Sequence, residues 1–291
     1  MHRLACGLSL VLLLACDAAS DDSDAGAGAG GAGQSAGGGR SGAGASGSGG
    51  AGTGPAADGG GEGDAGSDDA GSAPQPLRIQ VFSRTLGFRH ESIEPAQAAL
   101  RSIAARISAK LELGEDPAQL VTRLADTDVV VFLMTTGDVL DAAQQTAFER
   151  FIRDGGGFVG VHSAADTEYD WPFYGALNGA WFKDHPAVQK AKLVVDAPSH
   201  PIVSSLPASW ERSDEWYNFR DNPRGKVDVL LRLDESSYSG GNMGADHPIA
   251  WCHAIDRGRA FYTGLGHTNE SWQDAFVLQH VERALLWVAR R

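Results

Sequence analysis

Hydrophobic and polar positions follow alternating strand and helix periods in residues 77–162, the first part of a folded region that extends to residue 291. Runs rich in Val, Ile, Leu and Phe predict strands at 77–82, 110–113, 128–134 and 155–162. Apolar positions spaced three or four apart predict helices over 95–107, 117–125 and 141–154. The run 128–134 is apolar at nearly every position, which is typical of a strand buried on both faces of a parallel sheet.

The second half of this region is less regular. Three further strands are predicted at 227–233, 248–255 and 259–265, and Ser271 is expected to cap a final helix, with Asp274 completing a capping box. Residues 167–226 are rich in aromatics and Pro, and we expect insertions there that wall a pocket. The pattern predicts an α/β fold, a doubly wound, mostly parallel sheet flanked by helices, in a single folded domain over 77–291.

The first 76 residues have a different composition. Residues 1–16 combine a basic start with a short apolar run, which indicates a signal peptide. The sequence Leu13-Leu14-Ala15-Cys16 resembles a bacterial lipobox, so we expect lipidation of Cys16, an ordinary signal peptide being the alternative. Residues 17–76 consist almost entirely of Gly, Ala, Ser and Asp and predict a disordered linker. The expected location is therefore outside the cytoplasm, lipid-anchored to the bacterial cell envelope.

The net charge limits the expected binding partners, and the cysteine content limits the expected thiol chemistry. The formal net charge is −13 and the chain has no basic run, so nucleic acid is not an expected partner. The lipid anchor is the expected contact with the membrane. Cys252 lies in an apolar run and is expected to act as a small buried hydrophobe.

The most informative segment is 155–166, Gly-Gly-Gly-Phe-Val-Gly-Val-His-Ser-Ala-Ala-Asp. A buried strand ends at His162, and the small residues Ser163, Ala164 and Ala165 allow a sharp turn. The layout resembles a nucleophile elbow in which an imidazole replaces the usual Ser or Cys. The alternative is a histidine that merely caps a strand end.

Several other loops carry polar and aromatic residues directly after predicted strands. Because the carboxyl ends of parallel strands share one edge of a sheet, His90, His162 and His267 are expected to approach one another. Two further segments, 178–186 and 213–219, place aromatics beside carboxylates, a composition suited to carbohydrate binding. We expect the substrate-binding residues to be His90, Asp138, Asp166, His185, Asp214, Glu215, Tyr217 and Trp272.

Four ordered motifs, 88–93, 160–166, 214–217 and 258–267, together resemble the ThuA-like (trehalose utilisation) family. The resemblance implies a flavodoxin-like fold similar to class I glutamine amidotransferases, and a link to disaccharides processed through 3-keto derivatives. Those amidotransferases carry a thiol at the elbow, where this chain has His162, and Cys252 lies within a predicted strand. Glutamine hydrolysis is therefore not expected.

Three functional hypotheses remain open. In the first, His162 and His267 act as general base and acid on a glycoside or 3-keto-sugar. In the second, a divalent metal is held by His162, His267 and one of His90, His185, Asp214 or Glu215, in a sugar hydrolase or isomerase. In the third, the protein is a non-catalytic sugar-binding lipoprotein. The first strand-to-helix turn lacks GxGxxG, so a separate sugar oxidoreductase would supply any redox chemistry.

Overall fold

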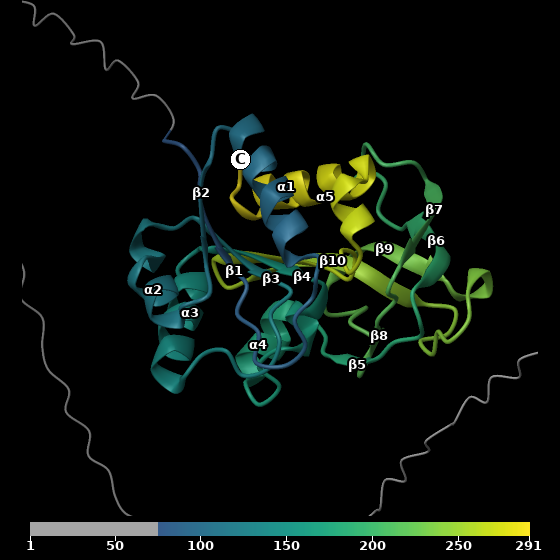
Figure 1. The fold of residues 1–291 in the computed structure, drawn as a ribbon, viewed down its shortest axis with the longest axis horizontal. Coiled ribbons are helices and arrows are strands. Elements are labelled where there is room, and N and C mark those ends of the chain that lie inside the picture. The colour runs from purple at the N-terminus through teal and green to yellow at the C-terminus, as the bar shows by residue number, and fades with distance from the viewer. Residues whose placement is uncertain (1–74) are drawn as a thin grey trace, which may run out of the picture. The chain divides into compact units, whose positions relative to one another are not determined.

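The computed structural model describes residues 75–291. Its centre is a nine-stranded sheet with the order β2-β1-β3-β4-β11-β10-β9-β6-β7 (Figure 1). The first five strands in this order run parallel to one another. They are β2 (Lys110–Gly114), β1 (Arg78–Phe82), β3 (Val129–Leu133), β4 (Gly157–Val161) and β11 (Gly258–Thr263).

The other half of the sheet is antiparallel throughout. It contains β10 (His247–Ile255), β9 (Asp228–Asp234), β6 (Gln189–Val195) and β7 (Ser209–Asp214). A separate two-stranded sheet pairs β5 (Phe182–Asp184) with β8 (Asn218–Phe219). The antiparallel strands extend the sheet beyond its parallel half. Asp214 is the last residue of β7, the edge strand of this extension.

Helices cover both faces of the parallel half (Figure 1). Helices α1 (Ile93–Arg106) and α5 (Ala275–Val288) pack with Val131 and Val159 in one core cluster. Helices α2 (Pro117–Thr122), α3 (Ala142–Arg153) and α4 (Pro172–Asn178) contribute to a second cluster around Phe132 and Phe158 on the opposite face. Strand residues that alternate between the two clusters explain why β3 and β4 are buried at every position. The predicted doubly wound α/β fold is confirmed.

Residues 167–226 contain more regular structure than their sequence indicates. Besides α4, they supply β6 and β7 to the main sheet. Strand β7 has the sequence SWERSD and lies at the edge of the sheet with only Arg212 and Asp214 buried. A strand with charged residues at its buried positions lacks the apolar alternation that identifies strands from sequence.

The start of the last helix also differs from the prediction. Residues Asn269–Gln273 form a 3-10 turn, and Asp274 rather than Ser271 caps α5 by accepting from the amides of Phe276 and Val277. The Ser271 hydroxyl instead donates to Asp214, 2.9 Å away. The expected capping box is therefore wrong. Three further 3-10 turns span Leu124–Asp126, His162–Asp166 and Glu235–Ser237.

The remaining sequence predictions concern the N-terminal segment and Cys252. The signal peptide, the linker and the lipidation of Cys16 lie outside the described residues. No helix within 75–291 is long and apolar enough to cross a membrane. Cys252 is fully buried in β10, where burial raises the pKa of its thiol to about 12, which confirms its expected role as a small hydrophobe.

Candidate metal centre

The elbow after β4 holds His162 in a strained conformation. The residue has a φ of +52°, in the left-handed region that non-glycine residues seldom adopt. Two contacts hold it there: the Tyr262 hydroxyl donates to the His162 carbonyl at 2.9 Å, and His162 Nδ1 lies 2.9 Å from the Gly264 carbonyl. Because a carbonyl can only accept, Nδ1 carries the proton and Nε2 presents a lone pair.

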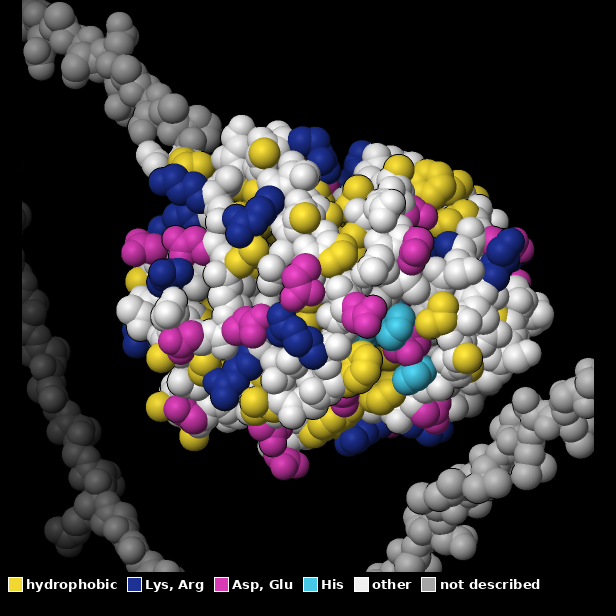
Figure 2. Space-filling model, in the orientation of Figure 1, with side chains coloured by type: hydrophobic (Ala, Val, Ile, Leu, Met, Phe, Trp, Pro, Cys, Tyr) yellow, Lys and Arg dark blue, Asp and Glu magenta, His cyan; other side chains and the backbone are white. Residues whose placement is uncertain are grey.

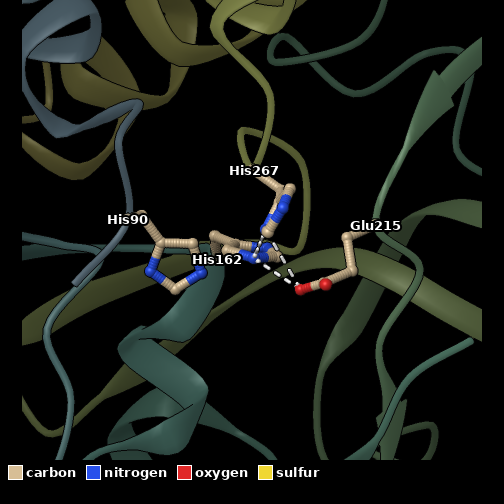
Figure 3. A group of neighbouring side chains, drawn as sticks. All are labelled: His90, His162, Glu215 and His267. Atoms are coloured by element: carbon tan, nitrogen blue, oxygen red, sulfur yellow. Dashed lines mark hydrogen bonds and ion pairs between the residues drawn. The ribbon is translucent and has the colours of Figure 1, made fainter. Parts of the chain in front are cut away.

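That lone pair faces two other potential ligand atoms (Figure 3). His162 Nε2 lies 3.3 Å from His267 Nδ1 and 3.3 Å from Glu215 Oε2. His267 Nδ1 lies 3.1 Å from the same Glu215 oxygen. The three atoms belong to residues in the segments that follow β4, β11 and β7. Residues far apart in the sequence therefore form one triangle of potential metal-ligand atoms.

His90, in the loop between β1 and α1, completes the cluster. One potential ligand atom from each of His90, His162, Glu215 and His267 lies within 4.8 Å of the others. The His90 ring meets the rings of His162 and His267 edge-on, with centroids 4.8 and 5.1 Å away. Burial, reinforced by repulsion from these two imidazoles, lowers the pKa of His90 to about 3. His90 is therefore neutral near pH 7 and available as a ligand.

Glu215 supplies the negative charge of the cluster. Burial opposes ionisation of its carboxyl, but contact with the His162 and His267 imidazoles outweighs burial and holds its pKa well below the usual range. The reciprocal effect raises the pKa of His267, since contact with Glu215 outweighs the desolvation that lowers it. The second carboxylate oxygen, Oε1, lies 3.0 Å from Nδ1 of the exposed His185.

Asp214, adjacent to Glu215, anchors the loop that carries His267. Its carboxylate accepts from the Gly266 amide at 3.0 Å and from the Ser271 hydroxyl at 2.9 Å, and it is buried against Arg212. The Trp272 indole donates to the Gly266 carbonyl at 3.0 Å. Asp214 and Trp272 therefore position the loop through contacts inside the protein.

An aromatic layer lies beside the cluster. The Tyr217 ring packs on the His162 ring with a centroid distance of 4.2 Å, and Phe182 packs on Tyr217 at 4.3 Å. Behind this layer, the buried His247 reaches the Tyr217 carbonyl through Nε2 and the Glu235 carboxylate through Nδ1, both at 2.8 Å. This support was not predicted, because nothing in the sequence around His247 connects it with residue 217.

The separations within the triangle match those of ligands around one metal ion. Zinc bound at about 2.0–2.1 Å in tetrahedral geometry holds its ligand atoms about 3.3–3.4 Å apart. The nitrogen and oxygen atoms of His162, His267 and Glu215 are 3.1–3.3 Å apart. The carbonyl that fixes the His162 tautomer is the kind of outer partner that metal-bound imidazoles have. The donor set and its spacing therefore fit a divalent transition metal.

The remaining predicted site residues lie at different distances from this centre. The structure gathers His90, His162, His267 and Glu215, with His185 and Tyr217 in contact with them. Asp166 accepts from the Tyr169 hydroxyl at 2.5 Å, next to Arg220, which stacks over the Tyr169 ring. Asp138 is exposed and is not a member of the cluster. Substrate binding by Asp138 and Asp166 stays a prediction.

The fold and the site define an α/β protein with a histidine- and carboxylate-lined centre at the carboxyl edge of its parallel strands. A family model described as trehalose utilisation, ThuA, matches residues 78–288. The chain belongs to this family, as its motifs predict.

Solved structures of similar fold include two ThuA-like proteins. One, from Bacteroides uniformis, is 25% identical, with a TM-score of 0.64 over 76% of this chain and 94% of the other. One from Parabacteroides merdae is 19% identical, with a TM-score of 0.63 over 74% of this chain and 90% of the other. A cytoplasmic protein from Salmonella typhimurium is 11% identical, with a TM-score of 0.51 over 73% and 99%. The search of curated proteins found no match.

Proposed function

We propose that this protein is a metal-dependent enzyme that cleaves glycosidic bonds in 3-keto-sugars. The observation that supports it best is the triangle formed by His162 Nε2, His267 Nδ1 and Glu215 Oε2, with separations suited to one divalent cation. His90 would be the fourth protein ligand. The name of the family, trehalose utilisation, favours a saccharide as the substrate.

The chemistry follows from the acidity of a carbon next to a ketone. A base removes the proton at C2, the C2–H electron pair forms the C1–C2 double bond, and the aglycone leaves C1 with its bonding pair and takes up a proton. Addition of water to the double bond then gives the free 3-keto-sugar, with no net oxidation. A divalent cation at the cluster would act as a Lewis acid toward a substrate oxygen such as that of the ketone.

His185 is suited to move the proton. Its Nδ1 lies 3.0 Å from Glu215 Oε1 and 3.0 Å from the Pro186 carbonyl, so it donates there and leaves Nε2 as the basic atom. A carboxylate that fixes the tautomer of an imidazole is the arrangement of many general bases. Glu215 would then serve the cation through one oxygen and His185 through the other.

The first experiment measures metal content and turnover together in the purified full chain. We expect about one divalent metal per chain, and release of glucose from 3-keto-trehalose that stops on chelation and returns when metal is added. His162→Gln should lose both properties. His185→Ala should lose turnover but keep the metal. His253→Gln is the matched control, because that imidazole bonds to the Ala176 carbonyl away from the cluster.

The outcomes separate the competing functions. Full turnover by metal-free protein would refute the metal and favour a second candidate, in which His162 and His267 exchange the proton directly. The observation favouring that candidate is the 3.3 Å contact between their ring nitrogens beside the Glu215 carboxylate. Saccharide binding without any turnover would favour a non-catalytic binding protein.

The cellular setting is part of the proposal. The apolar run before Cys16 and the polar segment after it favour an exported lipoprotein tethered to the bacterial envelope. The first strand-to-helix turn, residues 83–90, has no GxGxxG motif, so a separate sugar oxidoreductase would produce the 3-keto substrate. Metabolic labelling with a fatty acid tests the anchor: the natural chain should incorporate label and Cys16→Ser should not.

A further inference from the structure

A cleft of about 260 Å³ opens beside the histidine cluster. His90 and His267 contribute to its lining, and Phe88 and Val188 supply its apolar surface. Phe88 is 66% exposed and Val188 is 46% exposed, although most large hydrophobic side chains of this domain are buried. On the face of the molecule drawn in Figure 2, histidine, acidic and hydrophobic side chains adjoin one another.

The exposed Phe88 ring contacts the ring of His90. The two rings meet edge-on, with centroids 4.9 Å apart and an interplanar angle of 86°. An exposed aromatic ring fixed next to a reaction centre is a flat apolar platform. The C–H face of a sugar ring is complementary to such a surface, while its hydroxyls need polar partners at the edge.

The polar part of the cleft is acidic. Glu91, Asn269 and Glu270 contribute to the lining, and no Lys or Arg does among the described residues. Arg89, the cation nearest in sequence, is paired with Glu94 at 3.1 Å and with Glu115 at 2.9 Å. Carboxylates and amides accept hydrogen bonds from hydroxyls, and the two carboxylates repel phosphate and carboxylate groups.

The volume limits what can enter. Pockets for drug-sized ligands usually enclose about 300–1,000 Å³, so a cleft of about 260 Å³ holds one sugar ring but not two. The geometry points to a subsite for a single uncharged sugar ring, stacked on Phe88 with its hydroxyls on Glu91, Asn269 and Glu270. The second ring of a disaccharide lies outside this cleft. This inference rests on the proposed function, because it places the reacting ring beside the metal centre.

The test compares saccharide binding with metal content in the full chain. Trehalose binding is measured by calorimetry, and KM is measured with 3-keto-trehalose. Phe88→Ala should weaken both about tenfold, because the ring loses its apolar partner. Phe88→Tyr should retain both values, and metal content should be unchanged in both variants. Phe276→Ala is the control, since Phe276 is also partly exposed but lies on α5 against Trp210.

Charge is tested with glucose and glucose 6-phosphate as competitors of trehalose. We expect glucose to compete and the phosphate ester to compete at least tenfold less well. The subsite is overturned if Phe88→Ala changes binding by less than twofold, if the phosphate ester competes better than glucose, or if no saccharide binds. If the natural chain binds saccharide but holds no metal, the proposed function is contradicted and the subsite is retained.

Discussion

Asp214 offers the sharpest test of how this centre is built. Its buried carboxylate accepts from the Gly266 amide and the Ser271 hydroxyl, and it lies 3.4 Å from the Arg212 guanidinium. Asp214→Asn keeps the shape of the side chain but removes its charge. One of its two polar atoms then becomes a donor that faces other donors, and Arg212 is left buried with a weaker partner.

The expected magnitude follows from these contacts. Removing one partner of a buried ion pair costs about 3–5 kcal/mol. Asp274 remains 3.3 Å from Arg212 and compensates part of its charge, so we expect a loss near the lower end, about 3 kcal/mol. The loop that carries His267 should also shift, because the Gly266 amide loses its carboxylate acceptor. Metal affinity should then fall about 10- to 100-fold, as for other residues that orient metal ligands.

The assay combines urea unfolding with metal titration. Asp274→Asn is the matched control, because it also weakens a partner of Arg212 but leaves the Gly266 contact intact. Since Asn is a good N-cap, the control should cost no more than about 1 kcal/mol and should not change metal affinity. If Asp214→Asn costs less than 1 kcal/mol and binds metal normally, the loop is not held in the way described.

Two further predictions concern stability. Burial lowers the pKa of His280 from 6.5 to about 3. The free energy of unfolding should therefore decrease as pH falls from about 6.5 to 3, by up to about 5 kcal/mol. His280→Leu should flatten that part of the pH profile, measured by urea unfolding. A Cβ on Gly160 would lie 2.6 Å from the Asn178 side-chain oxygen, so Gly160→Ala should cost about 1–3 kcal/mol in thermal unfolding, whereas Gly114→Ala, with open space, should have little effect.

The sequence predicts the parts of the site that depend on topology. The carboxyl ends of parallel strands meet at one edge, so the convergence of His90, His162 and His267 follows once 77–162 is assigned as alternating strands and helices and 259–265 as a further strand of the same sheet. The sharp turn at His162 is also predicted from the sequence, because the small residues around it allow the left-handed conformation that the structure contains.

The sequence does not distinguish neighbours whose roles depend on the direction of a side chain. Asp214 and Glu215 are adjacent carboxylates, yet one anchors a loop and the other enters the cluster. That division depends on where β7 ends, and β7 is an edge strand with polar residues at its buried positions. The support of Tyr217 by His247 joins segments 30 residues apart through a side chain and a carbonyl, which no local pattern indicates.

The most direct test of the central claim is anomalous diffraction from crystals of the protein grown with a divalent transition metal. We predict one strong peak about 2.0–2.2 Å from His162 Nε2, His267 Nδ1 and Glu215 Oε2, the distances expected for such ligands. A fully occupied metal elsewhere in the protein, or no peak between these three atoms at saturating metal, would contradict the account.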